Sequence, residues 1–87
     1  MEVRFDDGQL GTARQLDGNI LTLEGPRAFA PGAPIRFVAS PLGEVRSYEG
    51  RTLGSKRLDD DERFVVRMRF VNLTREDRAM LTEALND

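Results

Sequence analysis

The sequence predicts a mainly β fold: a small antiparallel β-barrel closed by a C-terminal helix, with residues 1–87 forming a single domain. Short alternating segments are separated by turn signals rich in glycine, aspartate and proline, which is typical of antiparallel strands. The last of these segments, residues 64–71, alternates strictly and leads into a helix-capping pattern that starts at Thr74. A chain of 87 residues suits one compact domain with a modest core.

The first strand pair is predicted from a turn signal close to the amino terminus. Val3 and Phe5 alternate with Arg4 and lead into the sequence Asp-Asp-Gly at positions 6–8. Such a turn between two alternating segments favours a hairpin. We therefore expect residues 2–14 to form the first hairpin.

The next strand and the loop after it are predicted from a second turn and a proline-rich stretch. The turn at 17–19 precedes an apolar segment in which Leu21 and Leu23 would share the buried face. Residues 25–34 hold three of the four prolines, so this stretch is expected to be a loop between strands. Phe29 is expected to pin the loop to the core.

Two further strands are predicted in the middle of the chain. One begins at Ile35 and ends near residues 40–43. Residues 44–55 are interpreted as a long, bent strand, because the alternation is blurred by Gly50 and Gly54. Glycines inside a strand often mark a bulge or a sharp bend, and barrels turn corners at such places.

The acidic run at residues 59–62 follows this bent strand. The simplest interpretation is a solvated hairpin loop before the last strand. A divalent-cation site is the alternative, but adjacent acids lack the alternate spacing and the glycine of a calcium loop.

The C-terminal segment predicts a strand followed by a helix that acts as a lid. Phe64, Val66, Met68 and Phe70 would face inward, and Asp77 stands three residues after the Thr74 cap, which resembles a capping box. The helix carries one apolar stripe, made of Met80, Leu81, Ala84 and Leu85. This stripe is expected to cover the open barrel end, which would otherwise expose Phe64, Phe70 and Leu73.

The composition argues against several functional classes. The chain has neither cysteine nor histidine, so it lacks thiol chemistry, the usual metal ligand and the usual proton carrier at neutral pH. We therefore expect no enzyme activity and no bound metal or other cofactor. The sequence carries no apolar run of membrane-spanning length and no signal-peptide pattern, so we expect a soluble cytoplasmic protein without membrane insertion. The net charge of −2, with acids interspersed among the bases, argues against binding of a nucleic-acid polymer.

The basic residues are almost all arginine, with twelve arginines and one lysine. This bias reflects either the base composition of the source genome or a face built to bind carboxylate or phosphate, for which arginine is the better suited residue. Arg36, Arg67 and Arg69 are predicted to point outward, with Arg67 and Arg69 on the last strand and Arg36 beside them. They serve either for solubility and edge protection or as a patch that recognises an acidic protein partner.

The order of these signals resembles the PilZ domain, a bacterial six-stranded barrel with a C-terminal helix. Residues 11–25 look like the second and third strands of that family, and residues 30–37 look like its proline-glycine loop and the following strand. Residues 48–54 and 64–85 resemble the closing half of the domain. The resemblance implies a six-stranded antiparallel barrel and a role in cyclic di-GMP signalling.

PilZ domains bind cyclic di-GMP through two motifs, and the chain departs from both. One motif is a pair of arginines on an arm before the first strand, whereas Arg4, inside the predicted first strand, is the only arginine in this region. The other is aspartate or asparagine, any residue, serine, two residues and glycine. Its three specified positions correspond here to Gln15, Asp17 and Ile20, and none of them matches.

These departures lead to two hypotheses about the ligand. Asp17 places a carboxylate where a serine would meet an anionic ligand, and Ile20 adds a branched side chain where glycine allows close approach. The first hypothesis is therefore an adaptor that does not bind cyclic di-GMP and acts through a protein partner in motility or signalling assemblies. The second is a cyclic di-GMP receptor with a rearranged site made of Arg4, Arg14, Gln15 and Asp17.

Two further alternatives concern the arginines. Arg14 is either a phosphate contact or a surface residue paired with Glu24 or Asp17. A third hypothesis of another class is a generic small barrel that binds nucleic acid or peptide through Arg36, Arg67 and Arg69. Tyr48, the only tyrosine, gives it little support as a stacking residue.

Overall fold

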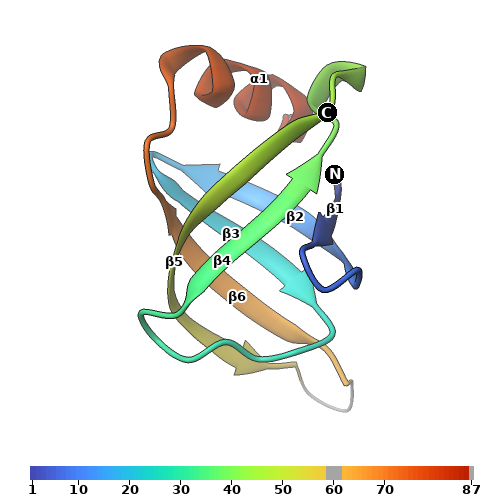
Figure 1. Ribbon diagram of the computed structural model, residues 1–87, viewed down its shortest axis with the longest axis vertical. Coiled ribbons are helices and arrows are strands. Elements are labelled where there is room, and N and C mark those ends of the chain that lie inside the picture. Colours follow the sequence, from blue (N-terminus) through green and yellow to red (C-terminus); the bar gives the residue numbers. More distant parts are fainter. Residues whose placement is uncertain (59–61, 87) are drawn as a thin grey trace.

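The computed structural model describes residues 1–58 and 62–86, which form a closed antiparallel barrel with a helix across one end (Figure 1). The described part of the chain contains six strands: β1 (Glu2–Phe5), β2 (Leu10–Asp17), β3 (Ile20–Gly25), β4 (Pro34–Ala39), β5 (Arg46–Arg57) and β6 (Phe64–Phe70). A short 3₁₀ turn, η1 (Pro41–Gly43), connects β4 to β5, and the helix α1 spans Arg75–Leu85. The predicted mainly β class and the six-stranded antiparallel barrel with its C-terminal helix are confirmed.

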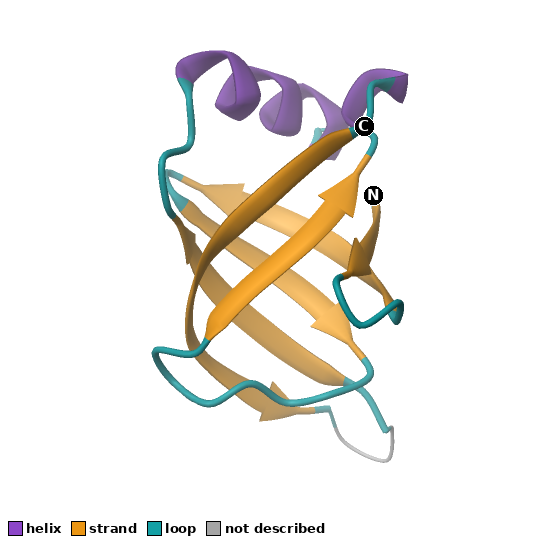
Figure 2. Cartoon of the chain, viewed as in Figure 1, coloured by secondary structure: helices purple, strands orange, loops and turns teal. Residues whose placement is uncertain are grey.

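The strands follow the order β1-β2-β3-β6-β5-β4 around the barrel, and β4 pairs with β1 to close it. The predicted first hairpin forms, because β1 pairs with β2, and the predicted turn at 17–19 joins β2 to its partner β3. Figure 2 shows the long loop at residues 26–33 crossing the end of the barrel opposite the helix. Among the described residues, the pairing of β4 with β1 closes the sheet, which removes the edge strands that small β proteins must otherwise protect.

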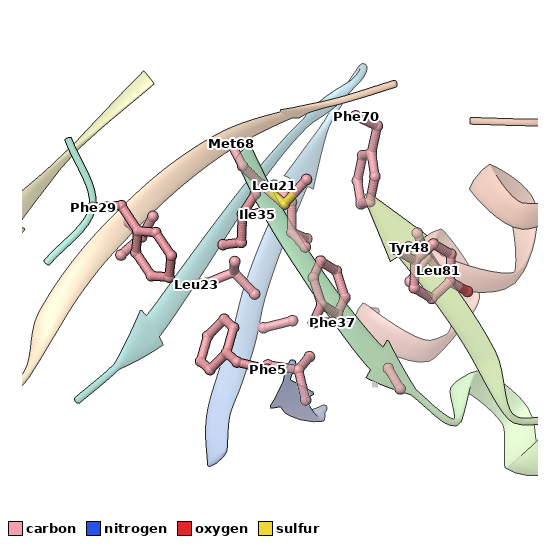
Figure 3. Close-up of a cluster of buried hydrophobic side chains, with 14 residues drawn as sticks. Phe5, Leu21, Leu23, Phe29, Ile35, Phe37, Tyr48, Met68, Phe70 and Leu81 are labelled. Atoms are coloured by element: carbon pink, nitrogen blue, oxygen red, sulfur yellow. The ribbon is translucent and has the colours of Figure 1, made fainter. Parts of the chain in front are cut away.

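Inward-facing residues of all six strands fill the barrel (Figure 3). The alternation read from the sequence is visible in β6, where Val66, Met68 and Phe70 are buried while Arg67 and Arg69 are exposed. The buried apolar side chains are Val3, Phe5, Ala13, Leu21, Leu23, Phe29, Ile35, Phe37, Ala39, Tyr48, Val66, Met68, Phe70 and Leu81. Burying each large side chain contributes roughly 1.5–3 kcal/mol, so this single core is the main source of stability.

Phe29 anchors the 26–33 loop as predicted. It is buried against Phe5, with ring centroids 5.9 Å apart. The Oγ of Ser55 on β5 accepts a hydrogen bond from the Phe29 N–H and donates one to the Phe29 carbonyl oxygen. The loop is therefore fixed to β5 by both packing and hydrogen bonds.

The long strand β5 bends where the sequence indicated a bulge, although only one of the two glycines lies there. The register between β5 and β6 shifts between Thr52 and Gly54, and Gly54 has a φ of 142°. Gly50 keeps regular pairing with Phe70. Its role is close packing: a Cβ at this position would lie 2.2 Å from the carbonyl oxygen of Arg69.

The helix covers one barrel end, but the prediction that it covers Phe64 is wrong. Leu81 is fully buried beneath the helix, and Met80, Ala84 and Leu85 are half-buried. Phe64 starts β6 and Phe70 ends it, so the two lie at opposite ends of the barrel (Figure 1). The helix therefore covers the end that holds Phe70, and Phe64 packs near the other end.

The start of the helix differs in part from a capping box. The Thr74 Oγ1 accepts a hydrogen bond from the Asp77 N–H at 3.1 Å, as predicted for an N-cap. The Asp77 carboxylate, however, accepts from Arg46 at 3.3 Å and makes no return bond to Thr74 within the described residues. Asp77 therefore ties the helix to β5.

Candidate functional site

The corner between β2 and β3, where the ligand motif of the resembled family would fall, is a tight hairpin. Asp17 pairs with Ile20 across a two-residue turn of Gly18 and Asn19. Gly18 has a φ of 62°, which suits a turn with glycine at its first central position. Asp17 is exposed and Ile20 is half-buried, so an anion and an apolar side chain flank the turn.

Arg14 lies in a β-bulge near this corner and is paired with Glu24. The register of β2 against β3 shifts between Ala13 and Gln15, which leaves Arg14 as the extra residue. The Arg14 Nε donates to a Glu24 carboxylate oxygen on the neighbouring strand. The prediction of an ordinary surface pair with Glu24 is therefore confirmed.

The four residues of the rearranged-site hypothesis do not all come together. Arg14, Gln15 and Asp17 follow one another at the end of β2. Arg4 lies on β1 opposite Leu10, four residues before Arg14 along β2. This separation is about 13 Å along the strand, so Arg4 is remote from the other three residues.

The hairpin corner is also joined to the helix. Asn19 Oδ1 accepts a hydrogen bond from the guanidinium of Arg78, and the Asn19 carbonyl oxygen accepts from the Phe70 N–H at 2.9 Å. Contacts from α1 and from β6 thus meet at the turn. These bonds hold the corner in one position and use polar groups that a ligand would otherwise contact.

The outward arginines form a different group from the one predicted. Arg67 and Arg69 are exposed on β6 as expected. Arg36 lies on β4, faces Glu49 of β5 and forms an ion pair with it at 3.5 Å. Because β5 lies between β4 and β6, the prediction that Arg36 sits beside the β6 arginines is wrong.

Arg51 takes the place predicted for Arg36. It is exposed on β5, and the register sets it directly opposite Arg69. The sequence contained a signal for this residue, because Ser47, Glu49 and Arg51 alternate with buried positions. We define the arginine face as the exposed residues Arg51, Arg67 and Arg69 on the outer surface of β5 and β6.

A second charged group joins the start of the helix to the start of β5. The guanidinium of Arg46 lies 3.0 Å from Glu44, 3.5 Å from Glu76 and 3.3 Å from Asp77. The nearby carboxylates, Glu44 first, raise the pKa of Arg46 above its ordinary value, so the group stays charged. Its role in the fold is to fix the helix on the barrel.

Tyr48 lies beneath this charged group, packed against Phe37 and Phe70 at centroid distances of 5.3 and 5.8 Å (Figure 3). Its hydroxyl is buried and has no hydrogen-bond partner among the described residues. Burial raises the pKa of Tyr48 to about 12, and the negative charge of Asp77 acts in the same direction. Tyr48 is therefore a core residue, which removes it as a surface stacking group.

The described residues show neither a metal-binding cluster nor a helix that could cross a membrane. Within residues 1–58 and 62–86, no three acidic side chains gather as metal ligands would. The suggested cation site at 59–62 falls mainly outside the described residues. No helix in the described part of the chain is long and apolar enough to cross a membrane.

Comparison of the chain with protein-family models, curated proteins and solved structures found no match. The fold and the two surface regions, the β2–β3 corner and the arginine face, are therefore the basis for a functional proposal.

Proposed function

We propose that this chain is a non-enzymatic bacterial adaptor domain of the PilZ type that works in the cytoplasm through protein–protein interaction, in motility or signalling assemblies. The architecture supports this proposal, because a six-stranded barrel with a C-terminal helix is the fold implied by the resemblance. Fold alone does not determine function. The β2–β3 corner adds the chemical support for this proposal.

The observation that carries the proposal is the chemistry of that corner. Cyclic di-GMP carries two phosphodiester charges, and the exposed carboxylate of Asp17 would repel them. Ile20 fills the position at which glycine would allow the ligand to approach the backbone. Arg14, the nearest cation on β2, already pairs with Glu24. The corner thus keeps the scaffold, while it sets a carboxylate and a branched side chain at the ligand positions and engages Arg14 with Glu24 and Arg78 with Asn19.

Isothermal titration of the intact chain with cyclic di-GMP tests this proposal. We expect no heat of binding at dinucleotide concentrations up to the order of 100 μM, well above the micromolar Kd of a functional receptor, which corresponds to about −8 kcal/mol. A PilZ domain with both motifs serves as the positive control. Micromolar binding by this chain would overturn the proposal.

The rearranged receptor site is the second candidate, and Arg14 is its best cation because the other cation, Arg4, lies apart from the corner. If the dinucleotide binds there, Arg14→Ala should abolish binding, whereas Arg75→Ala on the helix should leave it unchanged. Binding that survives Arg14→Ala would exclude this site.

A further inference from the structure

The arginine face contains a pair of like charges on two neighbouring strands. Arg51 and Arg69 stand directly opposite each other on neighbouring antiparallel strands, and both are exposed. Like charges in this arrangement destabilise a sheet, by a few tenths of a kcal/mol to about 1 kcal/mol. Arg67, two residues from Arg69 on the same side of β6, adds a third positive charge. Such a cluster needs an explanation beyond the fold.

The charges of this face are not neutralised by neighbouring acids within the described residues. Arg67 and Arg69 form no ion pair there, and the polar contact of Arg51 is to the Gly32 carbonyl oxygen at 3.2 Å. Two carboxylates on the strands of this region are engaged elsewhere, Glu49 of β5 by Arg36 and Glu24 of β3 by Arg14. The face is therefore positive, although the whole chain carries a net charge of −2.

Apolar surface lies beside these charges. Leu53 is 41% exposed, next to the bulge in β5, and Val65 is half-buried on the outer side of β6. Together with Arg67 they line a groove of about 620 Å³. A partner would bind this face more tightly if it carried carboxylates together with an apolar side chain.

We propose that the arginine face binds an extended, acidic protein segment in which carboxylates at alternate positions are followed by an apolar residue. The spacing supports this assignment. Arg69, Arg67 and Val65 project from the same side of β6 at two-residue intervals, about 6.7 Å apart, which is the spacing of alternate residues in an extended peptide. Guanidinium groups bind carboxylates in a two-bond geometry that lysine cannot provide.

An acidic protein segment fits this face better than nucleic acid does. Single-stranded nucleic acid is held by exposed aromatic rings as well as by cations. Phe5, Phe29, Phe37, Tyr48 and Phe70 are buried in the core, and Phe64 is half-buried at the start of β6. This inference rests on the proposed function and specifies the chemistry of its protein partner.

The test uses a fluorescently labelled octapeptide in which Glu, Glu, Leu and Glu alternate with serine. Fluorescence anisotropy gives the Kd, and NMR titration of the labelled chain locates the site. We expect amide shifts centred on Arg67, Arg69 and Arg51, and at least about a fivefold loss of affinity between 50 and 500 mM NaCl. The same peptide with lysine in place of glutamate should not bind.

The decisive variant is Arg69→Glu, matched by Arg75→Glu, which changes the net charge equally on the exposed face of the helix. We expect Arg69→Glu to weaken peptide binding by at least about tenfold and Arg75→Glu to leave it unchanged. The melting temperature of Arg69→Glu should stay level or rise, since a carboxylate opposite Arg51 replaces repulsion by attraction. A loss of affinity with an intact fold would assign the loss to the face.

Three outcomes would overturn the inference: no binding of the acidic peptide, an equal loss in both variants, or tighter binding of a single-stranded DNA dodecamer. The titration with cyclic di-GMP reports separately on the proposed function. If the chain binds both the acidic peptide and the dinucleotide, the proposed role of the arginine face stands and the adaptor proposal is wrong. If the chain binds neither, the adaptor proposal stands and the proposed role of the arginine face is wrong.

Discussion

The backbone carbonyl oxygen of Arg69 lies 2.2 Å from the position that a Cβ on Gly50 would occupy. Real Cβ atoms do not approach an oxygen so closely. The Cε of Met68 would lie 2.4 Å from the same point, so the space above Gly50 is filled from two sides. Gly50 therefore allows β5 and β6 to approach each other beneath the arginine face.

Gly50→Ala should destabilise the barrel by about 3 kcal/mol, at the upper end of the cost of overpacking, because one obstructing group is backbone. Urea denaturation followed by circular dichroism measures the free energy of unfolding. Gly8→Ala is the control: no atom lies within 4 Å of its Cβ position, and its φ of 90° limits the cost to about 1 kcal/mol. Equal losses in the two variants would contradict the packing role of Gly50.

The strands could be predicted from the sequence because each buries one face. In β6 the alternation from Phe64 to Phe70 indicates directly which side chains face the core and which face the solvent. The role of Gly50 could not be predicted, because a glycine in a strand indicates a bulge and a close approach equally well. Only the register with β6 separates the two roles, and that register depends on the bulge at Gly54.

Thr74→Ala should lower the free energy of unfolding by about 1 kcal/mol. The Thr74 side chain satisfies the Asp77 N–H, which has no partner inside the helix. Thr82→Ala provides the control, because Thr82 is exposed on the same helix and alanine is the better helix former. Thermal denaturation of both variants measures the difference. An unchanged stability of Thr74→Ala would mean that the cap contributes nothing.

A surface ion pair could be predicted from the sequence only where a short hairpin joins its two residues. The pair of Arg14 with Glu24 could be proposed because a short hairpin brings the two residues together. The contact between Arg46 and Asp77 joins residues 31 positions apart, and nothing in the local pattern around either residue indicates it. The arginine face was missed in part for the same reason, since the place of Arg51 depends on how β5 pairs with β6.

Arg46→Gln should lower the melting temperature and loosen the start of the helix. The substitution leaves Glu44, Glu76 and Asp77 near one another without the cation that lies within 3.5 Å of all three. The difference in melting temperature between the variant and the parent chain should be smaller in 1 M NaCl, where the Debye length is about 3 Å. Arg63→Gln is a matched control, because Arg63 directly precedes β6, and β6 starts at the end of the barrel opposite the helix (Figure 1). A difference that does not depend on salt would argue for packing by the Arg46 stem instead of charge.

Ionisation of Tyr48 should lower the free energy of unfolding at alkaline pH. Its pKa is raised to about 12 in the folded chain from the ordinary value of 10.0, so between these values the unfolded chain loses a proton that the folded chain keeps. The free energy of unfolding is therefore undiminished below pH 10 and decreases as the pH rises towards 12. Because the chain has one tyrosine, absorbance at about 295 nm follows this ionisation directly and should show it near pH 12.

Tyr48→Phe isolates that contribution, since every other titrating group is common to both chains. At pH 7 the variant should be more stable by about 1 kcal/mol, because it removes a buried hydroxyl without a partner among the described residues. Its advantage over the parent chain should widen from pH 10 to pH 12, where only the parent loses stability through the phenol. Urea denaturation at pH 7, 9 and 11 gives the difference in free energy of unfolding between the variant and the parent chain at each pH. A constant difference across this range would mean that the phenol ionises alike in the folded and unfolded chains, and would contradict its burial beneath the helix.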